Sequence, residues 1–286
     1  MTVGLVGLGL LGHAVARRLL AAGHRVVGFD LVPSRIGELS AIGGEGAASI
    51  RDVADASEAI CTVLPSLASV EEVILGPDGL LSTGRPGQAI FQMSTISPAL
   101  TERLAGEVGA RRREFLDCPI SGTSAMVARG DGVVLVGGEA ALFDRWRPLL
   151  EAVLPRAVRV GAPGLALKLV ANLLIALHSA AAAEALSLAR AAGLDLDVAL
   201  NVLGGSAAAS RMLDVRGPLI ARGNFPAQMK LDLFMKDLHL IQDAARAAGA
   251  PLPLTDVAER LYASAQAAGH GEEDLAVVVT ALGAAR

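Results

Sequence analysis

Residues 2–24 read TVGLVGLGLLGHAVARRLLAAGH, and this stretch decides the fold expected for the first half of the chain. It opens with an apolar run typical of a buried strand and continues with leucine and valine at helical spacing. The turn between them has the pattern G-x-G-x-x-G. In such a turn the first glycine permits a tight bend, the second lets a pyrophosphate approach the backbone, and the third lets helix and strand pack closely. We therefore predict a dinucleotide site formed by Gly7, Leu8, Gly9, Leu10, Leu11 and Gly12, with a merely flexible turn as the alternative.

The second expected strand, RVVGFD, ends in an acid that supports this interpretation. Asp30 lies about 20 residues after the glycines, where a dinucleotide site places the carboxylate that binds the adenosine ribose. That carboxylate would repel a 2′-phosphate, so the sequence favours NAD over NADP. Arg35 keeps NADP open, because its guanidinium could reach such a phosphate.

Strand-like and helical segments alternate as far as residue 161. The further strand-like runs are EAICTVL, QAIFQM, REFLDCP and GVVLVGG. Nearly continuous apolar strands separated by helices predict a parallel sheet covered on both faces, so we expect an α/β, Rossmann-like doubly wound domain over residues 1–162. After GAPG at 161–164 the strand pattern stops. We expect an all-α domain over residues 163–286, with helices at 165–192, 195–204, 229–248 and 255–268.

Composition excludes several classes of protein. The 29 acidic and 25 basic residues leave a net charge of −4 without a dense basic cluster, which argues against a nucleic-acid partner. The longest apolar stretch is interrupted by Asn172, His178 and Glu184, so we expect no membrane span. Cys61 and Cys118 fit buried hydrophobes and offer no metal-ligand spacing, so we expect no metal site. The N-terminus opens directly into a strand without a leader, which predicts a cytoplasmic protein.

One lysine stands out in the run GLALKLVANL at residues 164–173. Lys168 interrupts an apolar helical pattern, and Asn172 lies one turn further on the same face. Such a lysine either extends its amine to solvent or holds a functional position in a cleft.

Together these segments resemble the β-hydroxyacid dehydrogenase family over essentially the whole chain, and the C-terminal half resembles most its L-threonate dehydrogenase branch. Besides the glycine turn, the matching motifs are Leu64-Pro65, Ser94-Thr95-Ile96-Ser97-Pro98, Asp117-Cys118-Pro119-Ile120-Ser121-Gly122, Gly161-x-x-Gly164-x-x-x-Lys168-x-x-x-Asn172 and Lys236-Asp237-Leu238. Several ordered motifs are far more specific than one. The chain departs from the family in two places. The loop that commonly reads S-G-G reads Ser121-Gly122-Thr123 here, and the segment RGNFPAQMKL lacks the frequent P-G-F.

The resemblance implies an NAD-dependent oxidoreductase that acts on a small β-hydroxyacid. It implies that Lys168 is the catalytic acid/base in a cleft between the domains, and that Asn172 orients the substrate. Ser121, Gly122 and Thr123 would bind the substrate carboxylate; a plain β-turn is their alternative. Further cofactor contacts are implied at Leu64, Pro65, Ser69, Thr95 and Lys236.

Three of these assignments, and one further candidate, have a structural alternative. Thr95 could be an ordinary helix N-cap, Lys236 could form a surface salt bridge, and Asn172 could be satisfied by a neighbouring loop. Asp274 fits a site residue and a helix-start carboxylate equally well.

Two rival functions share the dinucleotide site. The first is an imine reductase of the same architecture, although such relatives usually lack the lysine. The second is a non-enzymatic dinucleotide-binding scaffold, which would be expected to have lost Lys168 or the Ser121-Gly122 loop. For the hydroxyacid dehydrogenase we expect a homodimer or homotetramer assembled through the helical domain.

Overall fold

The computed structural model describes residues 1–161 and 163–283. The chain divides into two compact units, Met1–Lys168 (unit 1) and Leu169–Arg286 (unit 2). The boundary predicted from the sequence falls at residue 162, which lies outside the described residues, and it stays a prediction.

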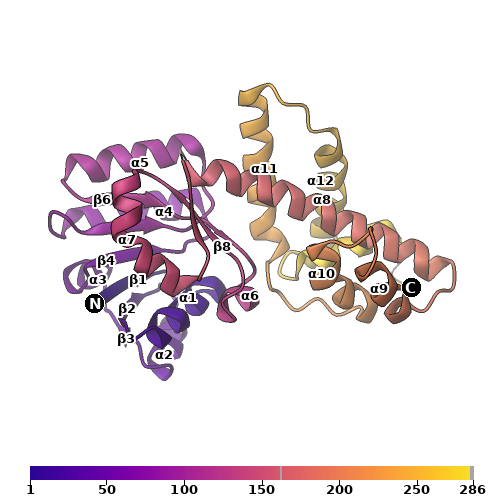
Figure 1. Cartoon of the computed structure of the whole chain (residues 1–286), viewed down its shortest axis with the longest axis horizontal. Coiled ribbons are helices and arrows are strands. Elements are labelled where there is room, and N and C mark those ends of the chain that lie inside the picture. Colours follow the sequence, from indigo (N-terminus) through magenta and orange to yellow (C-terminus); the bar gives the residue numbers. More distant parts are fainter. Residues whose placement is uncertain (162, 284–286) are drawn as a thin grey trace. The chain divides into compact units, whose positions relative to one another are not determined.

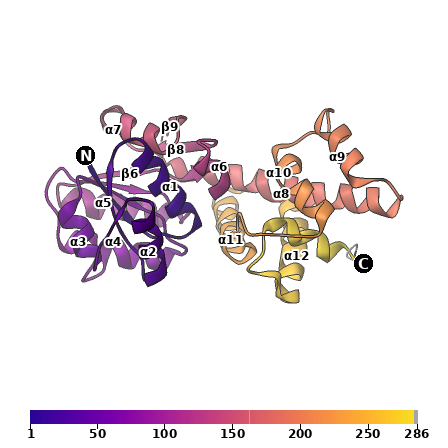
Figure 2. The same ribbon diagram turned by 90° about the horizontal axis from the view of Figure 1, so that it is seen from below.

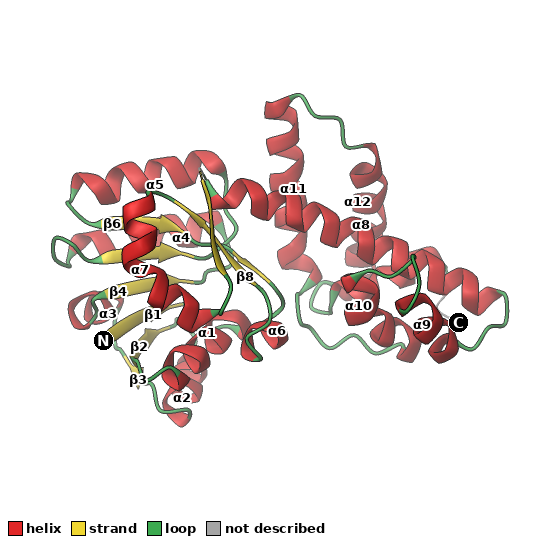
Figure 3. Ribbon diagram, in the orientation of Figure 1, coloured by secondary structure: helices red, strands yellow, loops and turns green. Residues whose placement is uncertain are grey.

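Unit 1 is built around a nine-stranded sheet (Figures 1 and 3). The strands are β1 (Thr2–Val6), β2 (Arg25–Phe29), β3 (Glu45–Gly46), β4 (Ala59–Thr62), β5 (Ala89–Gln92), β6 (Glu114–Asp117), β7 (Ile120–Ser121), β8 (Val133–Gly137) and β9 (Ala157–Gly161). The helices are α1 (Leu10–Ala21), α2 (Pro33–Ala41), α3 (Ile50–Ala56), α4 (Leu67–Leu75), η1 (Leu80–Ser82), α5 (Pro98–Ala110), α6 (Ser124–Ala128) and α7 (Ala140–Val153). Helix α1 contacts both α6 and α7, α4 contacts α5, and the sheet has helices on both faces. The Rossmann-like doubly wound fold is confirmed.

The strand order is β3-β2-β1-β4-β5-β6-β8-β7, with β9 paired to β8. From β3 to β6 all pairs are parallel, as expected. The last part differs from the expected parallel sheet, because β8 runs antiparallel to both β6 and β7. The expected strand REFLDCP is also shorter: it ends at Asp117, just before Pro119, whose ring nitrogen has no hydrogen to donate to a strand ladder.

The register aligns the carboxyl ends of five neighbouring strands. Val6 pairs with Phe29 on one side and Thr62 on the other, Thr62 pairs with Gln92, and Gln92 pairs with Asp117. The segments that follow these residues therefore emerge along one edge of the sheet, where open α/β sheets bind their ligands. The glycine turn follows β1, whose neighbours β2 and β4 lie on either side of the point at which the strand order reverses.

The core of unit 1 consists of small and aliphatic side chains with few aromatic rings. Phe91 and Trp146 meet edge to face with centroids 5.4 Å apart. Cys61 and Cys118 are fully buried and unpaired, which confirms their interpretation as small hydrophobes. Burial raises the pKa of Cys61 to about 12 and raises that of Cys118 as well.

Unit 2 is helical, as expected (Figure 2). Helix α8 (Gly164–Ala191) begins in unit 1 and continues into unit 2, followed by α9 (Leu196–Gly204), α10 (Arg211–Arg222), α11 (Leu231–Ala248), α12 (Pro253–Ala265), η2 (Gln266–His270) and η3 (Leu275–Leu282). The four helices expected from the sequence are all present, while α10 and η3 were not anticipated. The Tyr262 hydroxyl donates to the Ala176 carbonyl at 2.9 Å, and the Tyr262 ring packs against Phe234, so α8, α11 and α12 share one core.

Helix α8 corrects one expectation about membranes. By length and composition it is long and apolar enough to cross a bilayer, even though polar residues interrupt its sequence. Core helices of soluble proteins meet the same criterion, and 44% of its most apolar window is buried within the structure.

Candidate active site

The three glycines of the turn differ in how much space surrounds the position of a β-carbon. Gly7 has φ of +95°, and a β-carbon there would lie 2.1 Å from the Val63 carbonyl oxygen. A β-carbon at Gly12 would lie 2.0 Å from the Gly7 carbonyl oxygen. At Gly9, by contrast, φ is −63° and an added β-carbon would meet no described atom within 4 Å. Chain packing therefore requires two of the glycines, whereas the third leaves an open space beside the backbone.

This open space lies at the N-terminus of α1. Gly9 is the N-cap residue, and no side chain among the described residues caps it by a hydrogen bond. The first turn contains no acidic residue, so the amide groups and the helix dipole present positive potential there. These are the properties of a pyrophosphate site. In the same turn Leu10 is exposed and Leu11 is half-buried.

Asp30 is fixed by the backbone at the end of β2. Its carboxylate accepts hydrogen bonds from the amides of Leu8, at 2.7 Å, and Val32, at 2.9 Å. Arg35 pairs with the same carboxylate at 3.2 Å, although the arginine side chain is 43% exposed. The Leu8 side chain is buried in the core and its amide donates to Asp30, so Leu8 stabilises the conformation of the turn.

The turns after β4 and β5 are tied together. The Leu64 amide donates to the Ser94 hydroxyl at 2.8 Å, and the backbone of Ser94 in turn exchanges two hydrogen bonds with the buried Gln92 side chain. Ser69 forms a reciprocal capping box with Ser66 at the start of α4. The Ser69 hydroxyl thus has a structural partner, and its predicted cofactor contact stays a prediction.

Thr95 and Pro65 lie on the same two turns. Pro65 is exposed and Thr95 is half-buried. The N-cap of α5 is Ser97, whose hydroxyl accepts from the Leu100 amide at 3.2 Å. The alternative interpretation of Thr95 as that cap is therefore wrong. Its predicted cofactor contact stays a prediction.

The predicted carboxylate-binding loop begins in β7. Ser121 is half-buried and pairs with Val133 of β8. A β-carbon at Gly122 would approach described atoms no closer than 3.4 Å, so packing does not demand glycine there. Thr123 is buried and caps α6 by accepting from the Met126 amide at 3.3 Å. The unusual third residue of the loop therefore has a local structural role.

The start of α8 is fixed to the end of β6. The Leu165 amide donates to Asp117 Oδ2 at 2.7 Å, and the Asp117 carboxylate is buried. Burial raises the pKa of Asp117 to about 7, opposed by the hydrogen bond from Leu165. Lys168, one turn further along α8, is only 5% exposed. The interpretation of Lys168 as a lysine that extends into solvent is thus contradicted.

In unit 2 the side chain of Asn172 is oriented by Asp237. Asn172 is 1% exposed, and its Nδ2 donates to Asp237 Oδ2 at 2.8 Å. A carboxylate only accepts, so the amide nitrogen must face Asp237 and the carbonyl oxygen must face elsewhere. Lys236 forms an ion pair with Asp237 Oδ1 at 2.8 Å. The role of Asp237 was not anticipated from the sequence, although an acid on the apolar face of a helix was a usable signal.

Asp274 proves to be a structural carboxylate. It caps η3 and forms a buried ion pair with Arg216 at 3.0 Å. It also accepts from the amides of Gln228, Met229 and Ala276. Four donors fill the acceptor capacity of a carboxylate, so of the two equal alternatives the helix-start role is the correct one.

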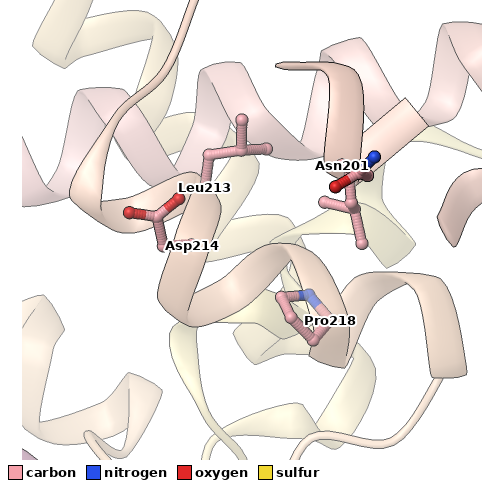
Figure 4. A pocket seen from close by; sticks show the side chains of 5 residues that line it. Asn201, Leu213, Asp214 and Pro218 are labelled. Carbon is pink, nitrogen blue, oxygen red and sulfur yellow. The ribbon is translucent and has the colours of Figure 1, made fainter. Parts of the chain in front are cut away.

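A surface pocket lies away from the predicted site residues. It has a volume of about 290 Å³, lies between α9 and α10 (Figure 4) and is lined by Leu200, Asn201, Leu213, Asp214 and Pro218. None of these is a predicted site residue. Within residues 1–161 and 163–283, no group of three or more His, Cys, Asp or Glu side chains could hold a metal ion.

Comparison with known proteins identifies the family. Residues 2–161 match the NAD binding domain of 6-phosphogluconate dehydrogenase, and residues 162–282 match the NAD-binding domain of NADP-dependent 3-hydroxyisobutyrate dehydrogenase. The chain is 35% identical to L-threonate dehydrogenase of Escherichia coli (strain K12), over 97% of this chain and 93% of that protein. It is 33% identical to 2-hydroxy-3-oxopropionate reductase of the same strain, over 99% and 97%.

Solved structures agree with this assignment. The crystal structure of 3-hydroxyisobutyrate dehydrogenase from Salmonella typhimurium is similar with a TM-score of 0.90 and 36% identity, covering 98% of this chain and 99% of that one. An imine reductase from Myxococcus stipitatus shares only the fold, with a TM-score of 0.66 and 18% identity, covering 99% and 100%. This distance counts against the imine reductase alternative. The chain therefore belongs to the β-hydroxyacid dehydrogenase family of NAD-binding oxidoreductases, with L-threonate dehydrogenases among its similar relatives.

Proposed function

We propose that this protein interconverts a small β-hydroxyacid and its oxo acid with NAD as the partner, and that Lys168 is the general acid/base. The observation that carries the proposal is the burial of Lys168 one turn into a helix whose first turn is fixed at the carboxyl edge of the sheet. The glycine turn and Asp30 lie along that same edge. Names of the relatives, which include L-threonate dehydrogenase and 2-hydroxy-3-oxopropionate reductase, indicate the class of substrate.

The residues of the glycine turn fit a dinucleotide. The space beside Gly9 would admit the pyrophosphate against the amides that open α1, and Asp30 would accept from the ribose hydroxyls. Two backbone donors hold that carboxylate in place, and its negative charge would repel a 2′-phosphate. Arg35, which could otherwise reach such a phosphate, is paired with Asp30. We therefore propose NAD rather than NADP. When bound, the nicotinamide supplies the hydride acceptor.

The remaining roles follow from the donors and acceptors present. The Lys168 amine accepts the hydroxyl proton during oxidation and returns it during reduction. Ser121 and the backbone of Gly122 donate hydrogen bonds to the substrate carboxylate. Asn172 offers its carbonyl oxygen to a substrate hydroxyl, since Asp237 holds its amide nitrogen. Lys236 stays a proposed cofactor contact despite its ion pair with Asp237.

The proposal is tested by following NADH formation with a panel of hydroxyacids that includes L-threonate, L-serine and 2-(hydroxymethyl)glutarate. Wild type, Lys168→Ala and Lys230→Ala are compared, because Lys230 forms an ion pair with Glu272 and serves as the matched lysine control. We expect activity on at least one acid, its loss in Lys168→Ala with NADH binding retained, and wild-type rates in Lys230→Ala. Undiminished turnover by Lys168→Ala would refute the mechanism. Tight NADH binding without turnover of any acid would favour the scaffold alternative.

We further propose a cytoplasmic homodimer or homotetramer. Support for assembly comes from large apolar side chains exposed on α8 and α9, namely Val170, Leu174, Leu188, Val198 and Val202. Light scattering coupled to size-exclusion chromatography measures the mass directly. A monomer at micromolar concentration would contradict this part of the proposal.

A further inference from the structure

The end of β6 carries a buried acid that the proposed reaction does not use. Asp117 is 3% exposed and pairs with Gln92 on one side and Gly137 on the other, so neighbouring strands fix its backbone. Its side chain accepts a hydrogen bond from the Leu165 amide at 2.7 Å. The other oxygen, Oδ1, is buried and has no hydrogen-bond partner among the described residues. Burying a carboxylate in this way is unfavourable, and such a group calls for a functional explanation.

The backbone segments around this hydrogen bond are closely packed. A β-carbon at Gly164 would lie 2.6 Å from the Leu135 carbonyl oxygen and 3.1 Å from that of Asp117. A β-carbon at Gly137 would lie 2.3 Å from the Gly164 amide nitrogen. The first turn of α8 therefore abuts the ends of β6 and β8 directly, backbone against backbone, and the Asp117 carboxylate supplies the hydrogen bond that fixes its rotation.

A helix fixed at its first turn also fixes the side chains of the second. Lys168 follows Gly164 by four residues, which is one turn of helix, so its Cα position depends on how α8 begins. The geometry points to Asp117 as a positioning residue for Lys168: by capping the first turn of α8, its carboxylate determines where the lysine amine is presented. This inference rests on the proposed function of Lys168 for its effect on turnover, whereas the positional effect can be measured without it.

Two substitutions at Asp117 separate position from mere stability. Asp117→Asn keeps an oxygen that can accept from Leu165, whereas Asp117→Ala removes the cap. We expect Asp117→Ala to lower kcat by about 100-fold, the order expected when a reacting group is misplaced by about 1 Å. The KM for NAD and the Kd for NADH should stay unchanged, because the substitution leaves the glycine turn intact. Asp117→Asn should restore most of kcat.

A spectroscopic measurement reports the lysine itself. The sequence contains three lysines, so incorporation of [13Cε]lysine gives three signals, of which Lys168 and Lys230 are assigned with the Lys168→Arg and Lys230→Arg variants. We expect Asp117→Ala to shift the Lys168 signal and to leave that of Lys230 in place, and Asp117→Asn to return it toward the wild-type position. Asp195→Ala is the matched control, since Asp195 caps α9 by accepting from the Val198 amide at 2.9 Å. It should move neither signal nor kcat.

The outcomes are distinct. A Lys168 signal that stays at its wild-type position in Asp117→Ala would overturn the inference, as would equal losses in Asp117→Ala and Asp195→Ala. If no hydroxyacid is turned over by the wild type, the proposed function fails while the signal still decides the positional role. Should the alanine variant not fold, Asp117→Ser, with its shorter acceptor, is expected to shift the Lys168 signal in the same way.

Discussion

Replacing Gly9 with alanine separates folding from cofactor binding. The backbone of Gly9 has φ of −63° and ψ of −170°, which alanine adopts without strain, and the added methyl group would contact no described atom. Alanine lowers the entropy of the unfolded chain, worth about 0.4–1 kcal/mol, but it is a poorer N-cap than glycine. These two effects have similar size and opposite sign. We therefore expect the free energy of unfolding of Gly9→Ala to differ from wild type by less than about 1 kcal/mol.

Binding of NADH should respond quite differently. The methyl group would fill the space through which the pyrophosphate approaches the amides of α1, and hydrogen bonds to a charged group are worth about 1.5–3 kcal/mol. At about 1.4 kcal/mol per factor of ten, the Kd should rise by roughly 10- to 150-fold. NADH fluorescence titration measures the affinity and urea unfolding measures the stability of the same samples.

Gly12→Ala is the matched comparison for this experiment. Its β-carbon would lie 2.0 Å from the Gly7 carbonyl oxygen, so we expect a loss of about 1–3 kcal/mol in stability. If Gly9→Ala binds NADH as tightly as wild type, the space beside Gly9 does not receive the pyrophosphate and the reasoning fails.

Three further changes test other parts of the structure. Asp30→Ser leaves Arg35 without its carboxylate partner. We expect the ratio of NADP affinity to NAD affinity to rise by about tenfold or more, which corresponds to roughly 1.4 kcal/mol of binding free energy. An unchanged ratio would show that Asp30 does not determine the choice of cofactor. Asp117 has a folded-state pKa of about 7 against an ordinary value near 4, so the folded protein holds this proton more tightly and loses stability as pH rises from about 4 to about 7. Melting temperatures of Asp117→Asn should therefore gain on wild type across that range, and a constant difference would contradict the raised pKa. Asp274→Ala would leave Arg216 buried without its carboxylate, and we expect a loss of about 3–5 kcal/mol in urea unfolding; a loss below about 1 kcal/mol would show that Arg216 finds another partner.

The sequence predicted the parts of the fold that depend on local pattern. Gly7 and Gly12 could be recognised because this turn between strand and helix leaves no room for a β-carbon at either position. The strands were visible as apolar runs because both faces of the sheet are covered. Strand direction was not visible in the same way, since β8 has the same apolar pattern whichever way it runs.

Helix α10 escaped prediction for a physical reason. Gly217 and Pro218 lie within it, and both residues disfavour helix interiors. The helix forms nonetheless because its other face is buried around Arg216 and Ile220, so packing outweighs local propensity.

The candidate site was predictable residue by residue but not in its connections. Lys168 stood out because a cation in an apolar helical run is rare. The first turn of its helix is held to Asp117 by a contact between residues 48 positions apart in the chain, which no local pattern contains. The pairing of Asn172 with Asp237 spans 65 positions and was missed for the same reason.

The two cysteines make this protein convenient for spectroscopy. Cys61 and Cys118 are the only cysteines in the sequence; both are buried, and their raised pKa disfavours the thiolate that maleimides attack. A new surface cysteine in each unit would therefore accept a fluorophore without removal of the native thiols. Energy transfer between two such dyes, with and without NADH, would follow the distance between the units during a catalytic cycle.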